Sequence, residues 1–541
     1  MRTIFFLPYL LNSFAKTAAP ADNSALSSCR EAVMPLPTAL LAAALKRFQL
    51  AARHPEAAQQ QILQQILQQN AASVFGRRHG FADMAGYSAF AQQVPIRRYE
   101  DYRADIDALA AGGNGLLTAE PVIQFEETGG SSGGAKLIPY TASLLAAFRR
   151  GVLPWLADLA QHRPQAFAGR LFFIISPAAR SRHHTAGGTP IGSGSDLAYF
   201  GEETGAALAA QTLFQAELTQ ARSAAEWQWH SARLLLSAAD LSLISVWSPT
   251  LLLAIFHTLV AEQDSLLASL SDPHRRRTAQ HAFRGGRFDA RLLWPQLDTV
   301  SCWNSHTAAL PAAELQALLP DVHLQGKGLL ATEAVSSLPF SGSPQPLLAV
   351  DSHFYEFAAA DGSIRPAHQL NSGQDYRLIV TTQGGLYRYD TGDRVAVYGF
   401  SGALPQLEFI GRDHLTSDLC GEKLTEAFVR RALLAVDKRL PEQALLQGVA
   451  ANPPHYRLLL PEHTPWPPQL AARLDEALAA NPQYAYARRI GQLAPVQAVR
   501  LPDPQAYAAT LHRADQRLGT RKIPLLLPPL TPEAAFRPQA T

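Results

Sequence analysis

The sequence predicts an α/β protein with a large N-terminal domain and a smaller C-terminal α+β domain. Helix-like hydrophobic spacing alternates with short apolar strands from residue 36 to about residue 357. Strands expected at residues 376–382 and 394–397 make the end of this body rich in β-structure. After residue 412 the chain has the pattern of a smaller mixed unit. We therefore expect domains at residues 36–412 and 413–541, preceded by a leader at residues 1–35.

The expected elements follow one another along the N-terminal domain. Ile62, Leu63, Ile66 and Leu67 fall on one stripe of a helix among paired glutamines. This helical region ends near Pro95, and a second helix is expected at residues 99–109. Strands are expected at residues 122–125, 137–140 and 171–176, and Thr141 should cap a helix that runs to about residue 155. Residues 178–194 read as a long loop, and a proline-rich tail begins near residue 524.

Composition excludes several classes of protein. Hydrophobic residues make up 47% of the 541 residues and charged residues 17%, which is typical of a globular protein. The 47 Lys and Arg nearly balance the 45 Asp and Glu, so we expect no nucleic-acid or membrane partner. The basic run at residues 274–277 reads as a solvated turn. Three cysteines lie far apart without metal-ligand spacing, which favours a reducing compartment, the cytoplasm.

The N-terminus has a weak likeness to a targeting segment. An apolar run follows Met1-Arg2, but Pro8 interrupts it and a featureless stretch continues to Met34. We expect residues 1–35 to be a disordered leader or a mis-assigned start. No other stretch approaches the ~20 apolar residues that a membrane helix needs.

A glycine-rich segment is the strongest local signal. TGGSSGG occupies residues 128–134 and is followed by Ala135 and Lys136. Glycines let several backbone N–H groups converge on an anion, while hydroxyls and a lysine add further donors and charge. The segment therefore suits a phosphate, although plain glycine-rich turns have the same composition.

Two other motifs overlap the glycine-rich segment. Residues 129–133 satisfy G-x-S-x-G, the nucleophile elbow of hydrolases, which needs a helix directly after it. A Walker-type P-loop also needs a helix at this point. Here the residues that follow the glycines have the pattern of a strand that contains Pro139. Because a proline would stop a helix at this point, the sequence disfavours both the nucleophile elbow and the Walker-type P-loop.

Two further signals lie downstream. LYRYDTGD, residues 386–393, places an aspartate in a turn after a strand, where a carboxylate could accept hydrogen bonds from ribose hydroxyls. An ordinary hairpin turn would have the same pattern. Gly411-Arg412-Asp413 and the charged stretch at residues 418–426 combine a domain boundary with groups that could close over a nucleotide. A solvated helix start would look similar.

Taken in order, these signals resemble the adenylate-forming superfamily of acyl-CoA synthetases, luciferases and related ligases. The wider pattern is closer to one branch, the Gretchen Hagen three or auxin-responsive promoter family of acyl-acid amido synthetases, bacterial members in particular. The resemblance extends from about residue 36 to residue 524. It includes VFGRRHGF, VPIRRYEDYRADI, TGGSSGGAKLIPYT, VWSPTLLL, GKGLLATE, SHFYEF, GLYRYDTGDRV and SDLCGEKLTEAFV.

The resemblance implies a set of site residues. It places catalytic groups at Lys136, Glu333 and Lys423, with Glu333 also holding Mg²⁺ beside the phosphates. It places ATP contacts at Thr128, Gly129, Gly130, Ser131, Ser132, Gly133, Thr332, Asp393 and Arg412. Asp393 would bind the ribose, and Arg412 would lie at the hinge between the domains.

The implied activity has two half-reactions. A small carboxylic acid would attack the α-phosphorus of ATP to give an acyl-adenylate, and an amine, an amino acid for this family, would then displace AMP. The resemblance implies a mobile C-terminal domain that closes over the site, in a monomer or weak homodimer. An acyl-CoA ligase with a thiol acceptor and a non-catalytic nucleotide-binding protein remain alternatives on the same fold. The sequence does not specify the acid or the amine.

Overall fold

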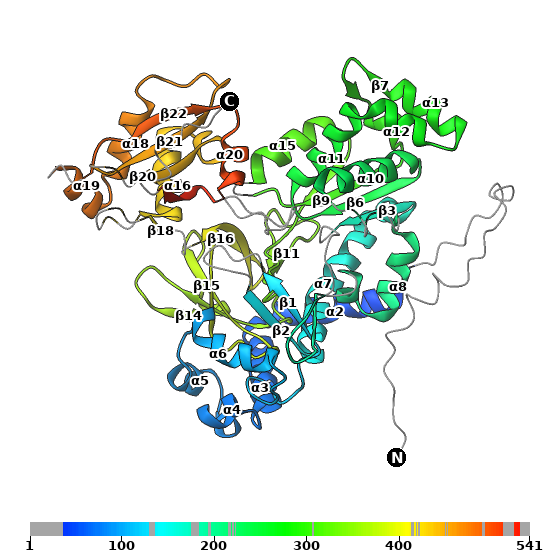
Figure 1. Ribbon diagram of the computed structural model, residues 1–541. Coiled ribbons are helices and arrows are strands. Elements are labelled where there is room, and N and C mark those ends of the chain that lie inside the picture. Colours follow the sequence, from blue (N-terminus) through cyan, green and yellow to red (C-terminus); the bar gives the residue numbers. More distant parts are fainter. Residues whose placement is uncertain are drawn as a thin grey trace.

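Three lobes make up the molecule, as Figure 1 shows: N-terminal helices with antiparallel strands, a helical layer around a parallel sheet, and a C-terminal unit. The coordinates are a computed structural model. They describe residues 36–128, 136–174, 183–192, 196–214, 218, 221, 223–305, 308–412, 416–417, 419, 422, 424–449, 451, 453–489, 493–511 and 524–530. The leader expected at residues 1–35 lies outside the described residues.

The N-terminal helices form the base of the first lobe. The glutamine-rich helix is confirmed: Ile62, Leu63, Ile66 and Leu67 are all buried along one side of α3. The helix expected at residues 99–109 is also confirmed, because α6 carries buried apolar residues on one face. The elements of this part are α2 (Thr38–Arg53), α3 (Pro55–Asn70), α4 (Val74–His79), η1 (Phe81–Asp83), α5 (Tyr87–Gln93) and α6 (Tyr99–Ala110).

A small sheet with the order β2-β1-β5-β4 follows the N-terminal helices. Strands were correctly expected on both sides of the glycine-rich segment, where β1 and β2 pair antiparallel. The prediction of a plain loop at residues 178–194 is wrong for residues 183–192. There β4 and β5 form a hairpin, and Ile191 pairs with Phe125 of β1, a long-range contact that local composition cannot indicate. The strands are β1 (Gln124–Thr128), β2 (Lys136–Tyr140), β4 (His183–His184) and β5 (Pro190–Ile191).

Helix α7 (Ala142–His162) connects the small sheet to the parallel sheet. Thr141 caps it as predicted, with its hydroxyl accepting a hydrogen bond from the N–H of Leu144 at 3.1 Å. The helix continues seven residues past the expected end at residue 155, although Pro154 lies inside it. Burial of Trp155, Leu156 and Leu159 stabilises this extension against the local cost of the proline.

The parallel sheet has the order β10-β9-β6-β3, so the carboxyl ends of its strands meet at one edge. The strand expected at residues 171–176 is its β3. Leu243, Ile244 and Val300 are fully buried, and helices cover the sheet in Figure 1. Its elements are β3 (Arg170–Ile174), β6 (Leu241–Val246), β9 (Thr299–Cys302), β10 (His323–Gly326), η2 (Pro164–Phe167), η3 (Asp196–Phe200), α8 (Glu202–Gln211), α10 (Ala224–Ser237), α11 (Pro249–Ala261), α12 (Gln263–Ser269) and α15 (Ala309–Leu318).

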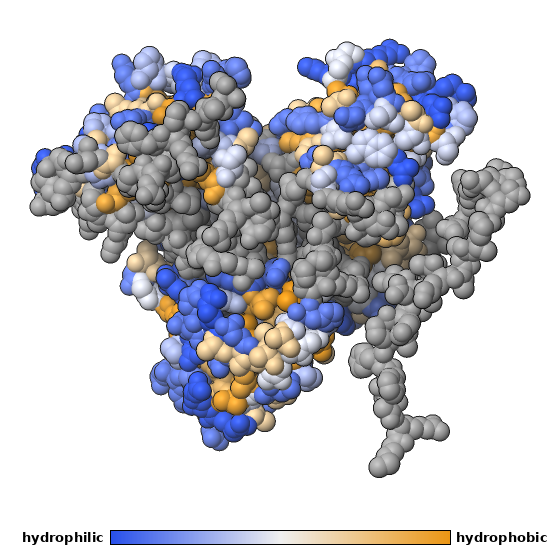
Figure 2. All heavy atoms as spheres, viewed as in Figure 1, coloured by the Kyte–Doolittle hydropathy of each residue, from blue (hydrophilic) through white to orange (hydrophobic). Residues whose placement is uncertain are grey.

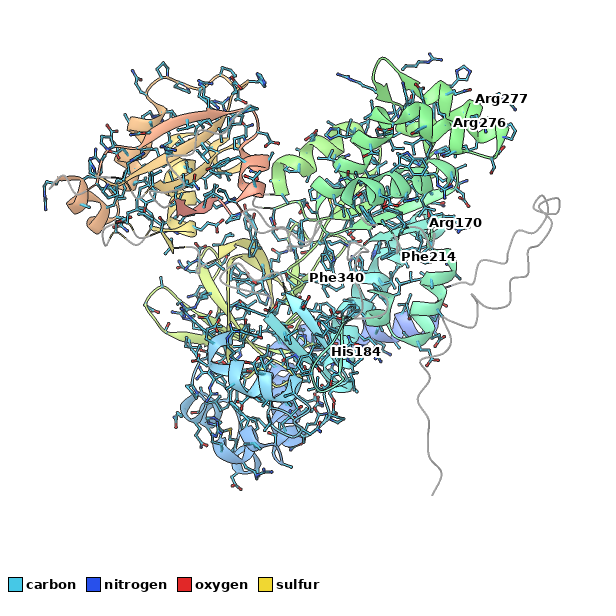
Figure 3. All side chains as sticks on the ribbon, in the orientation of Figure 1. Arg170, His184, Phe214, Arg276, Arg277 and Phe340 are labelled. Carbon is cyan, nitrogen blue, oxygen red and sulfur yellow. The ribbon has the colours of Figure 1, made fainter. Side chains whose placement is uncertain are left out.

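The prediction of a solvated turn at residues 274–277 is wrong. These residues begin α13 (Pro273–Ala282), which Asp272 caps. The Arg275 guanidinium is buried and donates to the carbonyl of Leu236 at 2.7 Å. Figure 3 shows Arg276 and Arg277 at the outer end of this lobe, far from the antiparallel strands, and Figure 2 shows mostly hydrophilic surface there. The adjoining elements are β7 (Phe283–Arg284), β8 (Arg287–Phe288) and α14 (Ala290–Leu293).

A seven-stranded antiparallel sheet with the order β11-β12-β17-β16-β15-β13-β14 returns to the first lobe. The strands expected at residues 376–382 and 394–397 are confirmed as β15 and part of β16. Phe357, Val380 and Val395 join the core of the N-terminal helices. The elements are β11 (Ser337–Leu338), β12 (Leu347–Leu348), β13 (Phe354–Ala358), β14 (Ile364–Pro366), η5 (Ala367–Gln369), β15 (Asp375–Thr381), β16 (Tyr389–Ser401) and β17 (Leu404–Arg412).

The C-terminal unit has its own hydrophobic core, which includes Leu424, Leu433, Leu458 and Leu474. Its sheet has the order β22-β21-β20-β23. The expected proline-rich tail is a strand in part, because β23 pairs parallel with β20. The elements are β18 (Thr416–Ser417), β19 (Leu424–Thr425), α16 (Glu426–Val436), α17 (Leu440–Gln443), β20 (Leu445–Val449), β21 (His455–Pro461), α18 (Leu470–Leu478), α19 (Pro482–Arg489), β22 (Gln497–Leu501), α20 (Pro504–Thr510) and β23 (Leu526–Leu530).

Within the described ranges, no single helix has the length and apolar composition needed to cross a bilayer. Only α11 and α12 together meet that criterion, and an 84° bend separates them.

Candidate functional site

A tight turn places Thr332 and Glu333 at its tip. Leu330 and Val335 form an isolated antiparallel bridge, and the N–H of Ala331 donates to the carbonyl of Ala334 at 2.9 Å. The carbonyl of Thr332 accepts a hydrogen bond from the Tyr140 hydroxyl at 2.6 Å. Because Tyr140 is the last residue of β2, this bond fixes the turn against the small sheet.

Two tyrosines from different sheets approach Glu333. The Tyr389 hydroxyl, at the start of β16, donates to Glu333 Oε1 at 3.5 Å. Burial, and then the neighbouring Tyr199, Glu126 and Glu333, hold the pKa of Tyr140 well above its ordinary value. Tyr140 is therefore protonated at neutral pH and acts as a hydrogen-bond donor. We call Tyr140, Thr332, Glu333 and Tyr389 the Glu333 cluster.

The glycine-rich segment connects the ends of an antiparallel pair. Thr128 is opposite Lys136 in the register of β1 and β2. The Lys136 ammonium lies 5.1 Å from the ring centroid of Tyr99, whose hydroxyl accepts a hydrogen bond from the N–H of Leu137 at 2.9 Å. A strand follows the segment, and the next helix begins only at Ala142. This order excludes the nucleophile elbow and the Walker loop, both of which need a helix directly after the glycines.

Arg388 holds the LYRYDTGD motif in an unusual backbone conformation. It has φ +50°, the one positive value recorded for a non-glycine residue within the described ranges. Its guanidinium pairs with the buried carboxylate of Glu356 at 2.8 Å and donates to the carbonyls of Ala91 and Val94 at 2.7 and 2.8 Å. These bonds stabilise a conformation that would otherwise cost roughly 1–3 kcal/mol.

The two aspartates of this motif have different surroundings. Asp390 is ion-paired with Arg98 at 3.5 Å and Arg377 at 3.3 Å, which is a structural role. Asp393 lies in a bulge of β16 in which Gly392 has φ +72°, and its N–H donates to the Thr391 hydroxyl at 3.0 Å. A bulge re-aims the side chains beside it. The Asp393 side chain is only 1% exposed.

The structure brings some of the predicted site residues near one another. Thr332 and Glu333 lie together, while Lys136 begins the strand that Tyr140 ends, roughly 13 Å away along β2. Asp393 and Arg412 are opposite each other in the register of β16 and β17. The other predicted residues, Gly129, Gly130, Ser131, Ser132, Gly133 and Lys423, lie outside the described residues, as do the side chains of Thr128 and Arg412.

Sequence reasoning missed Tyr140, Tyr389 and Glu126. Tyr140 and Tyr389 stand inside motifs that were singled out, but their hydroxyls gain a role only when β2, β16 and the 331–334 turn meet. Glu126 is 4% exposed, and its carboxylate raises the pKa of Tyr140. The sequence offers no signal for Glu126, because its strand reads QFEET and the burial of this one carboxylate depends on the fold.

Comparison with known proteins identifies the family. Residues 44–284 match the GH3 family N-terminal domain, and residues 347–412 match the GH3 family central domain. An indole-3-acetic acid-amido synthetase, GH3.5 of Arabidopsis thaliana, is 24% identical over 490 residues, which cover 76% of this chain and 78% of that one.

Solved structures show the same fold. The acyl acid amido synthetase AtGH3.15 in complex with 2,4-DB has a TM-score of 0.77 and 18% identity, covering 93% of this chain and 96% of that one. A 2-hydroxyisobutyryl-CoA ligase in complex with 2-HIB-AMP has a TM-score of 0.50 and 13% identity, with 88% and 90% covered. The two family matches together span more than half of the sequence. This chain belongs to the GH3 family.

Proposed function

We propose that this protein is an AMP-forming carbon–nitrogen ligase, which activates a carboxylic acid with ATP as an acyl-adenylate and transfers the acyl group to an amine. The observation that carries the proposal is the turn at residues 331–334. It presents Thr332 and Glu333 to the end of β2 and the start of β16, next to the strand that begins with Lys136. The names of related GH3 proteins, amido synthetases for indole-3-acetic acid and other acyl acids, support the same chemistry.

The residues around Glu333 fit a magnesium ion held jointly with phosphates. Within the described part of the chain, no group of three or more His, Cys, Asp or Glu could hold a metal without other ligands. Mg²⁺ typically takes one or two carboxylates together with substrate phosphates and water. Glu333 would supply the carboxylate, and the ion would neutralise phosphate charge as pyrophosphate leaves.

For ATP we propose contacts from both sides of the turn. The N–H and hydroxyl groups of residues 128–133 and the Lys136 ammonium would stabilise the charge that develops at the α-phosphorus. Thr332 would contact the nucleotide from the turn. Asp393 would accept hydrogen bonds from the ribose, and its 1% exposure means that the groups covering it must move first.

The first half-reaction needs no general base, because a carboxylate is already a nucleophile at neutral pH. Its attack on the α-phosphorus displaces pyrophosphate. An amine then attacks the acyl carbon and AMP leaves. Water would hydrolyse the mixed anhydride, so the site must exclude it between the two steps.

We propose that the C-terminal unit provides this exclusion. The predicted boundary at residue 413 comes directly after β17, whose last residue is Arg412, and a hinge needs only a few residues that absorb the backbone change. The separate hydrophobic core of the C-terminal unit would let it move as a body. Lys423 would then reach the site from this unit. We further propose an intracellular, monomeric or weakly dimeric enzyme, in keeping with Cys302, which is buried and free.

The second candidate function is an acyl-CoA ligase. The fold that this chain shares with 2-hydroxyisobutyryl-CoA ligase favours it, because both reactions begin with the same adenylation. The candidates differ only in whether the acceptor is an amine or a thiol.

The test is isotope exchange between pyrophosphate and ATP in the presence of Mg²⁺ and a panel of carboxylic acids. We expect exchange that depends on both the acid and Mg²⁺. Binding of ATP without acid-dependent exchange, for any acid in the panel, would instead indicate a non-catalytic nucleotide-binding protein.

A further inference from the structure

Lys327 extends into a cluster of aromatic and hydroxyl side chains. It directly follows β10, and its ammonium donates to the hydroxyls of Ser245 at 2.9 Å and Ser301 at 3.3 Å. The same nitrogen lies 5.1 Å from the ring centroid of Trp155 and 5.5 Å from that of Trp247. We call these five residues the Lys327 cluster. Its members come from α7, β6, β9 and the ends of strands.

No carboxylate balances the charge of Lys327 in the part of the chain that the structure describes. Its one titratable neighbour there is the Cys302 thiol, whose pKa burial raises to about 12, so the thiol stays neutral. Burial lowers the pKa of Lys327 to about 8. The ammonium is therefore mostly charged at neutral pH, and an unpaired charge with little water around it is costly.

The cluster lies where parallel sheets bind ligands. The carboxyl ends of adjacent parallel strands meet at one edge, which is the usual binding edge of such sheets. Trp247 follows β6, Trp303 follows β9 and Lys327 follows β10, and each keeps part of its surface exposed. The Trp247 and Trp303 rings are 5.6 Å apart between centroids. Ser245 and Ser301, inside the strands, are buried. The edge thus places two partly exposed tryptophans beside Lys327, whose ammonium points inward to the two serines.

Lys327 and the Glu333 cluster face different parts of the protein. Lys327 and Glu333 are only six positions apart in the sequence, but Lys327 packs against α7, β6 and β9. Glu333 instead contacts β16 and lies near the end of β2. Contacts between aromatic rings connect the two clusters. The ring centroids of Tyr199 and Tyr140 are 6.2 Å apart, and those of the adjacent Phe200 and Trp155 are 6.4 Å apart. If the reacting carboxylate of an acid lies beside Glu333, the rest of the acid would lie along these rings and extend toward Lys327.

We propose, resting on the function proposed above, that Lys327 recognises a second anionic group at the far end of the acyl acid. The preferred substrates are then dicarboxylic acids with an apolar or aromatic body. The rings would flank the body, and the far carboxylate would accept a hydrogen bond from the ammonium. A monocarboxylic acid of the same shape would leave the ammonium unpaired. Lys327 is in this way a specificity-determining residue.

The proposal predicts a defined pH dependence. The far carboxylate binds the protonated form of Lys327, which predominates below the pKa of about 8. Affinity for a diacid should therefore be high near neutral pH and fall as the pH rises above that value. Affinity for the matched monoacid should not follow this titration. The Cys302 thiol does not interfere, because it ionises only at much higher pH.

The experiment compares matched acids by calorimetric titration of the full chain with Mg²⁺ and α,β-methylene-ATP present. The pairs are phenylacetate with para-carboxyphenylacetate, phenylpropanoate with para-carboxyphenylpropanoate, and octanoate with suberate. For at least one pair we expect the diacid to bind about tenfold or more tightly at neutral pH, as one charge-assisted contact allows. The preference should disappear at about pH 9.5, where most of Lys327 is neutral, and in Lys327→Met.

Lys46→Met is the matched control, because Lys46 is an exposed lysine on α2, and it should keep the preference. Lys327→Met should melt no lower than the parent, since it removes a poorly solvated charge. The proposal is overturned if no diacid binds more tightly than its partner, or if Lys327→Met retains the preference. The calorimetric titration measures binding alone, because no turnover occurs with α,β-methylene-ATP. Preference for diacids without pyrophosphate exchange would thus contradict the proposed function alone, and exchange without the preference would contradict only the role of Lys327.

Discussion

Lys327 and Glu333 are six positions apart in the sequence, but the two clusters that they belong to are built in different ways. Tyr140 and Thr332 are hydrogen-bonded partners, and Tyr389 approaches Glu333 from an antiparallel sheet. The Lys327 cluster gathers single side chains from a helix and the ends of parallel strands, and its cation has no described anionic partner. Catalytic groups must be held in nearly fixed positions for the reaction to proceed. The preference for one acid over another can instead be changed by substituting a single side chain.

The largest effect is expected where the backbone beside the Glu333 cluster is most constrained. Arg388→Met removes one partner of the buried pair with Glu356, and breaking such a pair typically costs about 3–5 kcal/mol. We expect the free energy of unfolding in urea to fall by that amount. Arg291→Met is the control, since its ion pair with Asp321 is exposed and should not affect stability measurably. Equal stability of the two variants would show that Glu356 does not hold this segment.

The second effect separates chemistry from stability. Glu333→Gln keeps the shape of the side chain but removes the charge proposed to hold Mg²⁺, so we expect turnover to fall roughly 100-fold. The melting temperature should remain within error, because Glu333 is partly exposed. The measurement is the rate of pyrophosphate release across a magnesium titration. Glu476→Gln, at an exposed site on α18, should match the parent. Parental activity for Glu333→Gln at every magnesium concentration would remove Glu333 from the site.

The third effect concerns nucleotide affinity. Asp393→Ala should raise the KM for ATP about tenfold, since a hydrogen bond to a charged group contributes roughly 1.5–3 kcal/mol. The maximal rate should change less. Asp107→Ala, on the exposed face of α6, should leave the KM unchanged. If Asp393 only shapes the bulge, Asp393→Ala will lower the melting temperature while the KM stays at the parental value.

The smallest effect is expected for a substitution of Gly151, between the Glu333 and Lys327 clusters. A Cβ on Gly151 of α7 would come within 2.8 Å of Val335 Cγ1, at the base of the turn that carries Glu333. Overpacking of this kind costs roughly 1–3 kcal/mol. We expect Gly151→Ala to slow turnover several-fold and to leave the ratio of diacid to monoacid affinity unchanged. If Gly151→Ala instead changed the affinity ratio and kept the parental turnover, the roles of the two clusters in reaction and in acid recognition would have to be exchanged.

Elements that depend on local sequence were predicted well. The N-cap at Thr141, the stripe at residues 62–67 and the helix at residues 99–109 follow from spacing and capping alone. Elements that depend on distant pairing were not. Strands β4 and β5 exist because Ile191 meets Phe125, and β23 exists because it pairs with β20. A single sequence contains no direct record of such contacts.

The same distinction applies to the site. Lys136 and Asp393 stand in contiguous patterns whose chemistry can be proposed from neighbouring residues, whereas Glu333 was assigned through the resemblance to the family. Lys327 lies in GKGLLATE, a block that was recognised, but its lysine was not singled out. Its significance depends on Ser245, Ser301 and two tryptophans that are distant in sequence, and on the lack of an anionic partner among the described residues. Such an imbalance of charge becomes visible only after folding.

The most direct test of amide formation by this protein is a competition between acceptors. The protein is incubated with Mg-ATP, an acid that supports pyrophosphate exchange, an amino-acid mixture and coenzyme A, and the acyl products are identified by mass spectrometry while AMP is quantified. We predict an N-acyl amino acid formed in equal amount to AMP, with no thioester. A thioester as the main product, or AMP formed without any amide, would contradict the assignment of this GH3 family member as an amide-forming ligase.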